Sequence, residues 1–348
     1  MIDNYNYGAF LPQAIASARA QTHAAVNVIV VDDGSTDGSR EVLAGIDDEV
    51  TVVLKDNGGQ GSALNAGAEC CHGDIVMFLD ADDLLKPEAA ARIAATFAAD
   101  PGLAKVQYRM DVVDAAGRPT GEEKPWRHVP MPNGDLRQAE LDYSFDLGWM
   151  PTSANAFRID ALRRVLPIPD DYRILADWYL VHMTTLLGRV RSLEEICASY
   201  RVHGGNNFEH ERPELDLDHL RRSIRLARPT CAGLERLGDE LGLPRPRRVT
   251  SVADLGHRLV SLKLDPGRHP VRNDSVRSLL AEAMPTIRRR DDVSTTMKAM
   301  FAGWFVAIAM APRRLARPLA VYFLFPERRG GINRVLKRLH RNGRAAPR

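Results

Sequence analysis

The first 115 residues alternate short apolar runs with segments of helical spacing. Continuous runs rich in β-branched residues occupy positions 28–31 and 75–79, and similar runs cover 50–54 and 106–113. Such runs are typical of strands that are buried on both faces. Helical spacing lies between them, at 14–20, 39–43, 62–70 and 88–99. This alternation predicts an α/β fold with a mostly parallel sheet flanked by helices.

The pattern changes after this segment. Residues 116–175 are rich in proline, glycine and aspartate, which predicts loops. A helix is expected over 177–187 and an extended segment over 196–203. Helical segments rich in arginine, leucine and alanine then follow, interrupted by glycine and proline. The sequence therefore predicts an α/β domain over residues 1–210 and a mainly α-helical C-terminal region over 211–348.

Composition and charge narrow the class of protein. Hydrophobic residues make up 45% and charged residues 26% of the 348, which argues against a disordered or fibrous chain. Of the 47 basic and 45 acidic residues, 11 basic and one acidic residue lie in 312–348. The remaining body is therefore acidic, and we expect no nucleic-acid partner.

The cysteines and apolar segments indicate a cellular location. The four cysteines lack metal-site or disulfide-framework spacing, and the first residues lack the pattern of a secretory signal. The longest apolar stretch, 300–312, has 13 residues, whereas a membrane span needs about 20. Its Phe301, Trp304 and Phe305 and the following arginines favour a helix lying in the membrane interface, the alternative being a helix packed on its own domain. We expect a cytoplasmic protein with peripheral contact to the inner face of the cell membrane through 297–345.

Carboxylates follow two of the predicted strands. Asp32 and Asp33 end the run at 28–31, where ligands bind in open α/β sheets, and a carboxylate there can accept hydrogen bonds from a ribose or a base. Asp80, Asp82 and Asp83 end the run at 75–79, and their mutual repulsion favours a divalent cation with oxygen ligands, Mg²⁺ or Mn²⁺. A solvated turn is the alternative for the second group.

A glycine-rich segment over 57–67 precedes a predicted helix. Its glycines allow close approach of the backbone to a ligand, and a helix N-terminus favours anions. The spacing matches neither a dinucleotide-binding motif nor a P-loop. By itself this segment is weak evidence.

In combination, these motifs resemble family 2 glycosyltransferases of the Rossmann-like GT-A fold. The resemblance covers roughly the first 210 residues, in consistent order. Its segments are 3–6 (the end of the opening strand, usually Pro-x-Tyr-Asn), 31–35 (the nucleotide-binding turn), 57–67 (Asn-x-Gly…Asn-x-Gly), 80–82 (the DXD motif), 151–157 (the acceptor side), 176–177 (usually Glu-Asp) and 200–206 (Tyr-Arg-x-His-x-x-Asn).

The resemblance implies inverting transfer of a sugar from a nucleotide-diphosphate sugar to a hydroxyl of a saccharide or lipid-linked acceptor, in bacterial-type cell-surface polysaccharide or glycolipid synthesis. It implies Asp177 as the catalytic base and Asp80, Asp82 and His203 as ligands of Mn²⁺ or Mg²⁺. The implied donor contacts are Asn4, Tyr5, Asn6, Asp32, Asp33, Asn57, Gly59, Asn65, Asp80 and Ala81, and the implied acceptor-side residues are Thr152, Ser153 and Asn155.

Three departures from the family pattern leave alternatives open. Only Met1 and Ile2 remain of the first strand, Leu64 replaces a frequent arginine, and Ala176 replaces the usual glutamate. One alternative is a degenerate nucleotide-sugar-binding or membrane scaffold protein, against which the retained Asp177 argues. The other is a sugar nucleotidyltransferase, whose basic, glycine-rich phosphate loop is not seen near the start of the sequence.

Overall fold

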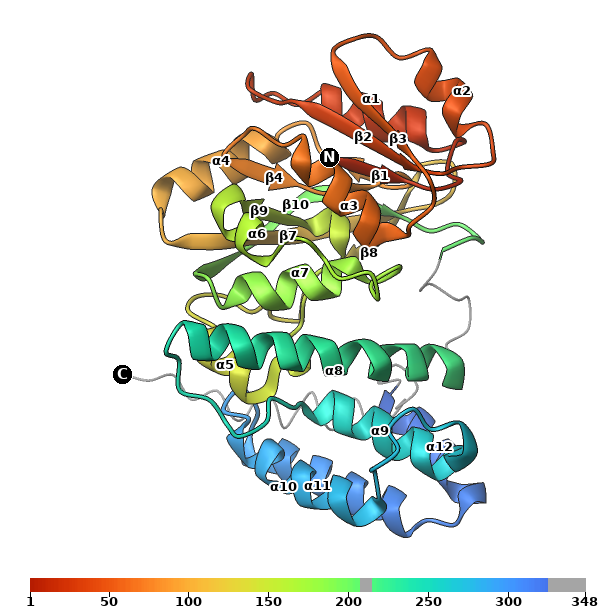
Figure 1. The fold of residues 1–348 in the computed structure, drawn as a ribbon, viewed down its shortest axis with the longest axis vertical. Helices are drawn as coiled ribbons and strands as arrows, with labels where there is room; N and C mark the ends of the chain where they lie inside the picture. The colour runs from red at the N-terminus through yellow and green to blue at the C-terminus, as the bar shows by residue number, and fades with distance from the viewer. Residues whose placement is uncertain (207–214, 325–348) are drawn as a thin grey trace. The chain divides into compact units, whose positions relative to one another are not determined.

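The structure is a computed structural model that describes residues 1–206 and 215–324 (Figure 1). The described residues divide into two compact units. Residues 1–140 and 147–206 form the first unit, whereas 141–146 and 215–324 form the second. Residues 141–146 thus interrupt the first unit in sequence but belong to the second unit.

A four-stranded parallel sheet forms one part of the first unit. In the order β3-β2-β1-β5 it contains β3 (Val50–Lys55), β2 (Val28–Asp33), β1 (Ile2–Asn4) and β5 (Leu79–Asp80). All six residues of β2 are buried, in line with its continuous apolar run. Although β1 has only three residues, it pairs in parallel with β2 on one side and with β5 on the other.

A six-stranded mixed sheet forms the other part. In the order β4-β9-β7-β10-β6 it contains β4 (Ile75–Met77), β9 (Asn155–Arg158), β7 (Leu103–Val113), β10 (Arg189–Arg201) and β6 (Leu84–Leu85), and β8 (Pro119–Lys124) also pairs with β7. The long strands β7 and β10 run parallel, and the other pairs are antiparallel.

The structure corrects two predictions about strands. The run at 75–79 is not one strand, because it divides at Phe78 into β4 and β5, which join different sheets. The segment 116–175 is not mainly loop, because it holds β8, β9 and several helices. Strand β8 is polar and mostly exposed, and it is held by backbone pairing to β7. A hydrophobic pattern carries no signal for such a strand.

Helices pack on both sheets (Figure 1). The helices of the first unit are α1 (Leu11–Arg19), α2 (Ser39–Ala44), α3 (Gln60–Glu69), α4 (Ala89–Ala99), α6 (Ile159–Val165) and α7 (Ala176–Thr185), with the 3₁₀ turn η2 (Thr152–Ala154). Helix α5 (Arg137–Tyr143) begins in this unit, and its last residues belong with the 3₁₀ turn η1 (Ser144–Asp146) to the second unit. Leu11 and Ile15 of α1 lie in one core with Val30 of β2, whereas Ile93 and Phe97 of α4 lie in a second. The predicted fold class, a mostly parallel α/β sheet flanked by helices with a helical C-terminal region, is confirmed.

The second unit is helical. It contains α8 (Leu217–Glu240), α9 (Val252–Leu264), η3 (Pro266–Arg268), α10 (Val276–Arg289), α11 (Thr295–Met310) and α12 (Arg313–Leu324). Side chains of Ser251, Ser275 and Ser294 cap the N-termini of α9, α10 and α11. The segment 141–146 joins this unit through Asp146, which accepts hydrogen bonds from two backbone N–H groups at the start of α9.

The structure of α11 changes the expectation that its aromatic side chains face a membrane. Trp304 and Phe305 of α11 are buried in the core of the helical unit, so these two side chains do not form an exposed membrane-facing surface. Over the part of the chain that the structure describes, no helix combines the length and the apolar character needed to cross a bilayer. The predicted membrane contact over 297–345 lies partly beyond residue 324, outside the described residues.

Candidate active site

A cleft of about 710 Å³ opens beyond the carboxyl ends of β1, β2 and β5. The parallel register places Asn4 opposite Asp32 and Asp3 opposite Asp80, so the ends of three strands meet at this edge. Twelve of the residues predicted from the sequence line the cleft: Asn4, Tyr5, Asn6, Asp33, Asn57, Gly59, Asp80, Ala81, Asp82, Thr152, Asp177 and His203.

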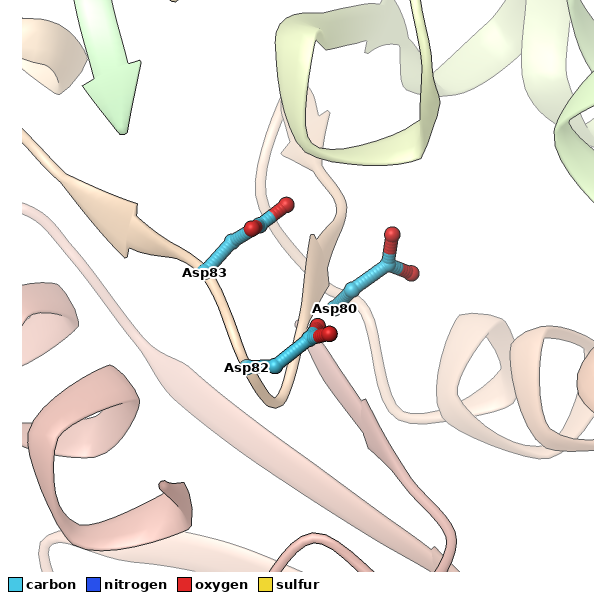
Figure 2. Close-up of side chains that lie close together, drawn as sticks. All are labelled: Asp80, Asp82 and Asp83. Atoms are coloured by element: carbon cyan, nitrogen blue, oxygen red, sulfur yellow. The ribbon is translucent and has the colours of Figure 1, made fainter. Parts of the chain in front are cut away.

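Three carboxylates lie together at the end of β5. Each of Asp80, Asp82 and Asp83 offers an oxygen atom, and these atoms all lie within 4.8 Å of one another (Figure 2). Asp80 ends the strand, and the other two lie in the turn that follows it. In the sequence, Asp83 belongs to the acidic run but is not among the implied metal ligands. In the structure its carboxylate lies close enough to those of Asp80 and Asp82 to bind the same ion.

Burial and mutual repulsion disfavour the charged form of these groups. Burial, together with the charges of Asp3 and Asp83, raises the pKa of Asp80 well above its ordinary value. Burial, followed by the charge of Asp82, raises the pKa of Asp83 to about 8. Oδ2 of Asp83 and Oδ1 of Asp3 are buried without a hydrogen-bond partner among the described residues. A divalent cation would supply a partner for such oxygens, so these residues fit Mg²⁺ or Mn²⁺.

His203 reaches this acidic turn from the segment after β10. Its Nε2 atom lies 3.0 Å from Oδ2 of Asp82. The backbone N–H of Gly205 donates to Nδ1 of the same ring at 3.3 Å, so the neutral ring carries its proton on Nε2 and donates to Asp82. The ring also packs against Phe10, with centroids 4.6 Å apart. The imidazole therefore orients the Asp82 carboxylate.

Arg201 fixes the backbone of the acidic turn through hydrogen bonds. This side chain is fully buried, and its Nε donates to the carbonyl oxygen of Asp82 at 2.7 Å. Its two terminal nitrogens donate to Gln13 and to the carbonyl of Ala115. The backbone N–H of Arg201 donates to Oδ1 of Asp83. The end of β10 is therefore bonded to the turn at two points.

Asp33 holds the glycine-rich loop against the end of β2. Its carboxylate accepts hydrogen bonds from the backbone N–H groups of Gly58 and Gly59, at 2.9 and 2.6 Å, and from Nζ of Lys55 at 2.6 Å. Gly59 has φ +87°, and a Cβ there would lie 2.6 Å from the Cα of Arg173. Only glycine tolerates both conditions. The glycines of this loop therefore allow close packing of backbone at the cleft.

Asp32 has a different role from its neighbour. It is fully buried, it does not line the cleft, and it accepts hydrogen bonds from Ser35 N–H, Arg40 Nε and Asn4 Nδ2. Burial would raise the pKa of Asp32, but the hydrogen bonds from Ser35, Arg40 and Asn4 outweigh it and lower that pKa. Asp32 therefore ties β1, β2 and the following turn together as a carboxylate.

Gln60 joins the acidic turn to the helix that carries Asp177. Its Nε2 lies 3.3 Å from Oδ1 of Asp80 and 3.2 Å from Oγ1 of Thr152. Its Oε1 accepts a hydrogen bond from the backbone N–H of Ala176, at 3.1 Å. The first residue of α3 thus contacts three parts of the cleft that are far apart in sequence.

Asp177 lies in the first turn of α7 and lines the same cleft. Its Oδ1 accepts a hydrogen bond from the backbone N–H of Trp178, at 2.8 Å. Burial raises the pKa of Asp177, and hydrogen bonds from Trp178 and Thr152 oppose the shift without cancelling it. A carboxylate with a raised pKa is a stronger base than an exposed aspartate. This residue can accept a proton from a group bound in the cleft.

Residues 1–160 match the family model described as glycosyl transferase family 2. These 160 residues, just under half of the chain, are similar to glycosyltransferase family 2. An uncharacterised glycosyltransferase of Nostoc sp. is 37% identical over 212 residues, which are 60% of this chain and 65% of the relative. This chain therefore spans just under two thirds of the length of that relative.

Two further relatives extend the comparison. Chondroitin synthase of Pasteurella multocida is 27% identical over 208 residues, covering 59% of this chain and 20% of the synthase. Residues 1–349 of TarS from S. aureus, in complex with UDP-GlcNAc, superpose with a TM-score of 0.56 at 14% identity, over 93% of this chain and 90% of that one. At this identity the likeness shows a shared fold.

Three more of the predicted site residues do not line the cleft. The side-chain amide of Asn65 exchanges hydrogen bonds with the backbone of Ile168, at 2.9 and 2.7 Å. Ser153 accepts a hydrogen bond from the backbone N–H of Asp80, and Asn155 donates to the carbonyls of residues 150 and 151. All three hold the backbone around the cleft, and their contacts with substrate stay predictions.

Other residues of the cleft were not named as site residues from the sequence, although seven of them lie in the matched segments 3–6, 57–67, 151–157 and 200–206. These other residues are Asp3, Tyr7, Phe10, Gln60, Ala63, Pro151, Arg173, Ile174, Leu175, Tyr200, Gly205 and Asn206. Asp3 carried a usable signal, because it directly precedes the predicted donor contacts Asn4, Tyr5 and Asn6. Arg173, which donates to Oδ1 of Asn57 at 2.6 Å, comes from a segment without a recognisable pattern.

Proposed function

We propose that this protein transfers a sugar from a nucleotide-diphosphate sugar to an acceptor hydroxyl, with inversion at the anomeric carbon. The observation that carries the proposal is the single cleft that holds both Asp177 and the acidic turn of Asp80 and Asp82. The hydrogen bonds of Gln60 to Asp80 and to the first residue of α7 support it, because they connect the base and the acidic turn.

The donor would occupy the half of the cleft formed by the ends of β1 and β2. Asn57 and Gly59 of the glycine-rich loop line this half of the cleft. The Asp33 carboxylate holds the loop against β2 by accepting hydrogen bonds from two of its backbone N–H groups. Asp80 and Asp82 would hold Mn²⁺ or Mg²⁺ beside the diphosphate, and His203, implied by the resemblance as a further ligand, would orient the Asp82 carboxylate. A bound divalent cation neutralises the charge that develops on the departing diphosphate.

The acceptor would occupy the side of the cleft formed by Thr152 and the start of α7. One carboxylate oxygen of Asp177 takes the proton of the acceptor hydroxyl as its oxygen attacks the anomeric carbon. The bond to the diphosphate breaks on the opposite face of the sugar, and the centre passes through an oxocarbenium-like state. The new glycosidic bond replaces the phosphate ester bond without a covalent enzyme intermediate.

The acceptor class rests on relatives. Chondroitin synthase and hyaluronan synthase of P. multocida are each 27% identical to this chain over 208 residues, and both names describe the synthesis of a polysaccharide. We propose a saccharide or lipid-linked acceptor in the synthesis of a cell-surface polysaccharide or glycolipid. The UDP-GlcNAc bound by the TarS fragment supports a nucleotide sugar as donor.

The proposal is tested by incubating the full chain and Mn²⁺ with a panel of nucleotide sugars and saccharide acceptors. We expect one donor to release its nucleoside diphosphate, and we expect the anomeric proton coupling of the product to show inversion. Asp177→Asn is the matched control, since it should bind that donor but release little product. Donor binding without turnover in the unaltered chain would favour the non-catalytic binding protein instead.

A further inference from the structure

From residue 299 to its end at Met310, helix α11 is apolar around its whole circumference. No charged residue lies between Lys298 and Arg313. On one side of the helix, Trp304, Phe305 and Ile308 are buried in the core of the helical unit. This side accounts for the folding of the helix onto α9, α10 and α12.

The other side of α11 is apolar and exposed. Met300, Val306 and Met310 are 37%, 49% and 80% exposed, and Gly303 and Ala307 between them are exposed as well. At about 100° per residue these five positions fall on one continuous stripe, opposite the buried side. A helix that is apolar all round is ordinarily buried all round. Within the described residues nothing covers this stripe, which we call the α11 stripe.

Arginines follow the α11 stripe directly. Arg313, Arg314 and Arg317 at the start of α12 are exposed, and none forms an ion pair with a described residue. Leu315 beside them is 57% exposed. The sequence from 293 to 326 contains no acidic residue. The surface therefore combines an apolar strip with uncompensated positive charge.

We propose that the α11 stripe and the first turn of α12 dock on an anionic lipid surface. The 16 residues of α11 extend about 24 Å, and a helix of this kind lies in the plane of the interface with its apolar side among the acyl chains. The three arginines then reach the lipid phosphates. The α11 stripe lacks hydrogen-bonding side chains, and its charged neighbours are of one sign. Both properties fit a fluid anionic surface better than a structured protein partner.

The proposal differs from the sequence prediction in the side chains that enter the lipid. The aromatic side chains of Trp304 and Phe305 are in the protein core. The side chains that would enter the lipid are therefore those of Met300, Val306 and Met310. The apolar contribution is therefore smaller than two inserted aromatic rings would provide. Binding should depend strongly on the arginines and on ionic strength, because surface charge attraction is screened by salt.

The test is flotation of the full chain with vesicles of phosphatidylcholine alone and of phosphatidylcholine mixed with phosphatidylglycerol. We expect binding to the mixed vesicles, with a decrease at high salt. The double variant Val306→Gln, Met310→Gln keeps the charge of the protein and should bind at least tenfold more weakly. Its matched control replaces two exposed apolar residues of the first unit, Val26→Gln and Leu54→Gln, and should bind as the unaltered chain does.

Charge is tested with a second pair of variants. Arg313→Glu with Arg314→Glu should abolish binding to the mixed vesicles, whereas the same charge change at the exposed Arg225 and Arg228 of α8 should leave most of it. Circular dichroism of each variant shows whether the fold is kept. Equal binding of the α11 variant and the unaltered chain would overturn the proposal. So would a dimer in solution that this variant dissociates while vesicle binding is absent, since the stripe would then contact a second copy.

Discussion

The Nε2 atom of His203 lies 3.0 Å from Oδ2 of Asp82, although the two residues are 121 positions apart in the chain. Because Gly205 donates to Nδ1, the Nε2 atom presents its proton to the carboxylate. The end of β10 therefore sets the orientation of a side chain in the acidic turn after β5. Both residues line the cleft in which we place the diphosphate.

Replacing His203 by glutamine should weaken the affinity for Mn²⁺. Groups that orient a metal-binding carboxylate typically change metal affinity or activity by about 10–100-fold when they are removed. The measurement is a titration of Mn²⁺ binding by electron paramagnetic resonance. His72→Gln, at an exposed position on the first unit, is the control and should leave the affinity unchanged. An unaltered affinity in the His203 variant would remove this residue from the site.

Removal of divalent metal should abolish turnover, and Asp82→Asn should nearly abolish it at saturating donor. The reason is that the buried carboxylates repel one another and the diphosphate, and the asparagine oxygen is a much weaker ligand. Activity is measured after treatment with EDTA and again after Mn²⁺ is added back. Full turnover in EDTA would show that the cleft works without a metal.

Gln60→Ala should lower turnover more than it changes the dissociation constant of the donor. The alanine loses the hydrogen bonds to Asp80, Thr152 and Ala176, which connect the acidic turn with the start of α7. We expect a decrease in kcat of at least tenfold, with a melting temperature close to that of the unaltered chain. A decrease confined to donor affinity would place the effect of Gln60 at the donor alone.

We expect the stability of the helical unit to fall in acid because of His257. Burial, followed by the charge of His219, lowers the pKa of His257 to about 4. Its ordinary value is about 6.5, so unfolding takes up a proton between these two pH values and the free energy of unfolding falls as the pH drops through this window. We expect His257→Gln to lose less melting temperature than the unaltered chain between pH 7 and pH 4.5. Parallel losses in the two proteins would contradict the assignment.

The sequence predicts the elements that depend on local burial. Strand β2 is recognisable because it is buried on both faces, and the carboxylates at its end follow from its position in the sheet. Strands β8 and β9 were missed, because β8 is polar and β9 has only four residues. Phe78, where β4 and β5 separate, lies inside an apolar run that gives no sign of the break.

Only part of the candidate site could be predicted from the sequence. Motif resemblance identified twelve residues that line the cleft, because the matched segments lie at the strand ends and helix starts that surround it. It did not separate Asp33, which faces the cleft, from Asp32, which is enclosed by three donors. That distinction, like the contact between Asp82 and His203, depends on side chains brought together by the fold.

The most direct test of the account is the turnover of Asp177→Asn with the donor found in the nucleotide-sugar screen. Asparagine keeps the size of the side chain and cannot accept the proton, so kcat should fall by about 10²–10⁴-fold while the donor dissociation constant stays unchanged. Because burial raises the pKa of Asp177, kcat of the unaltered chain should rise with pH through an inflection above the ordinary range of aspartate, about 3.9, and the variant should lack this limb. Turnover and pH profile equal to those of the unaltered chain would contradict the central claim.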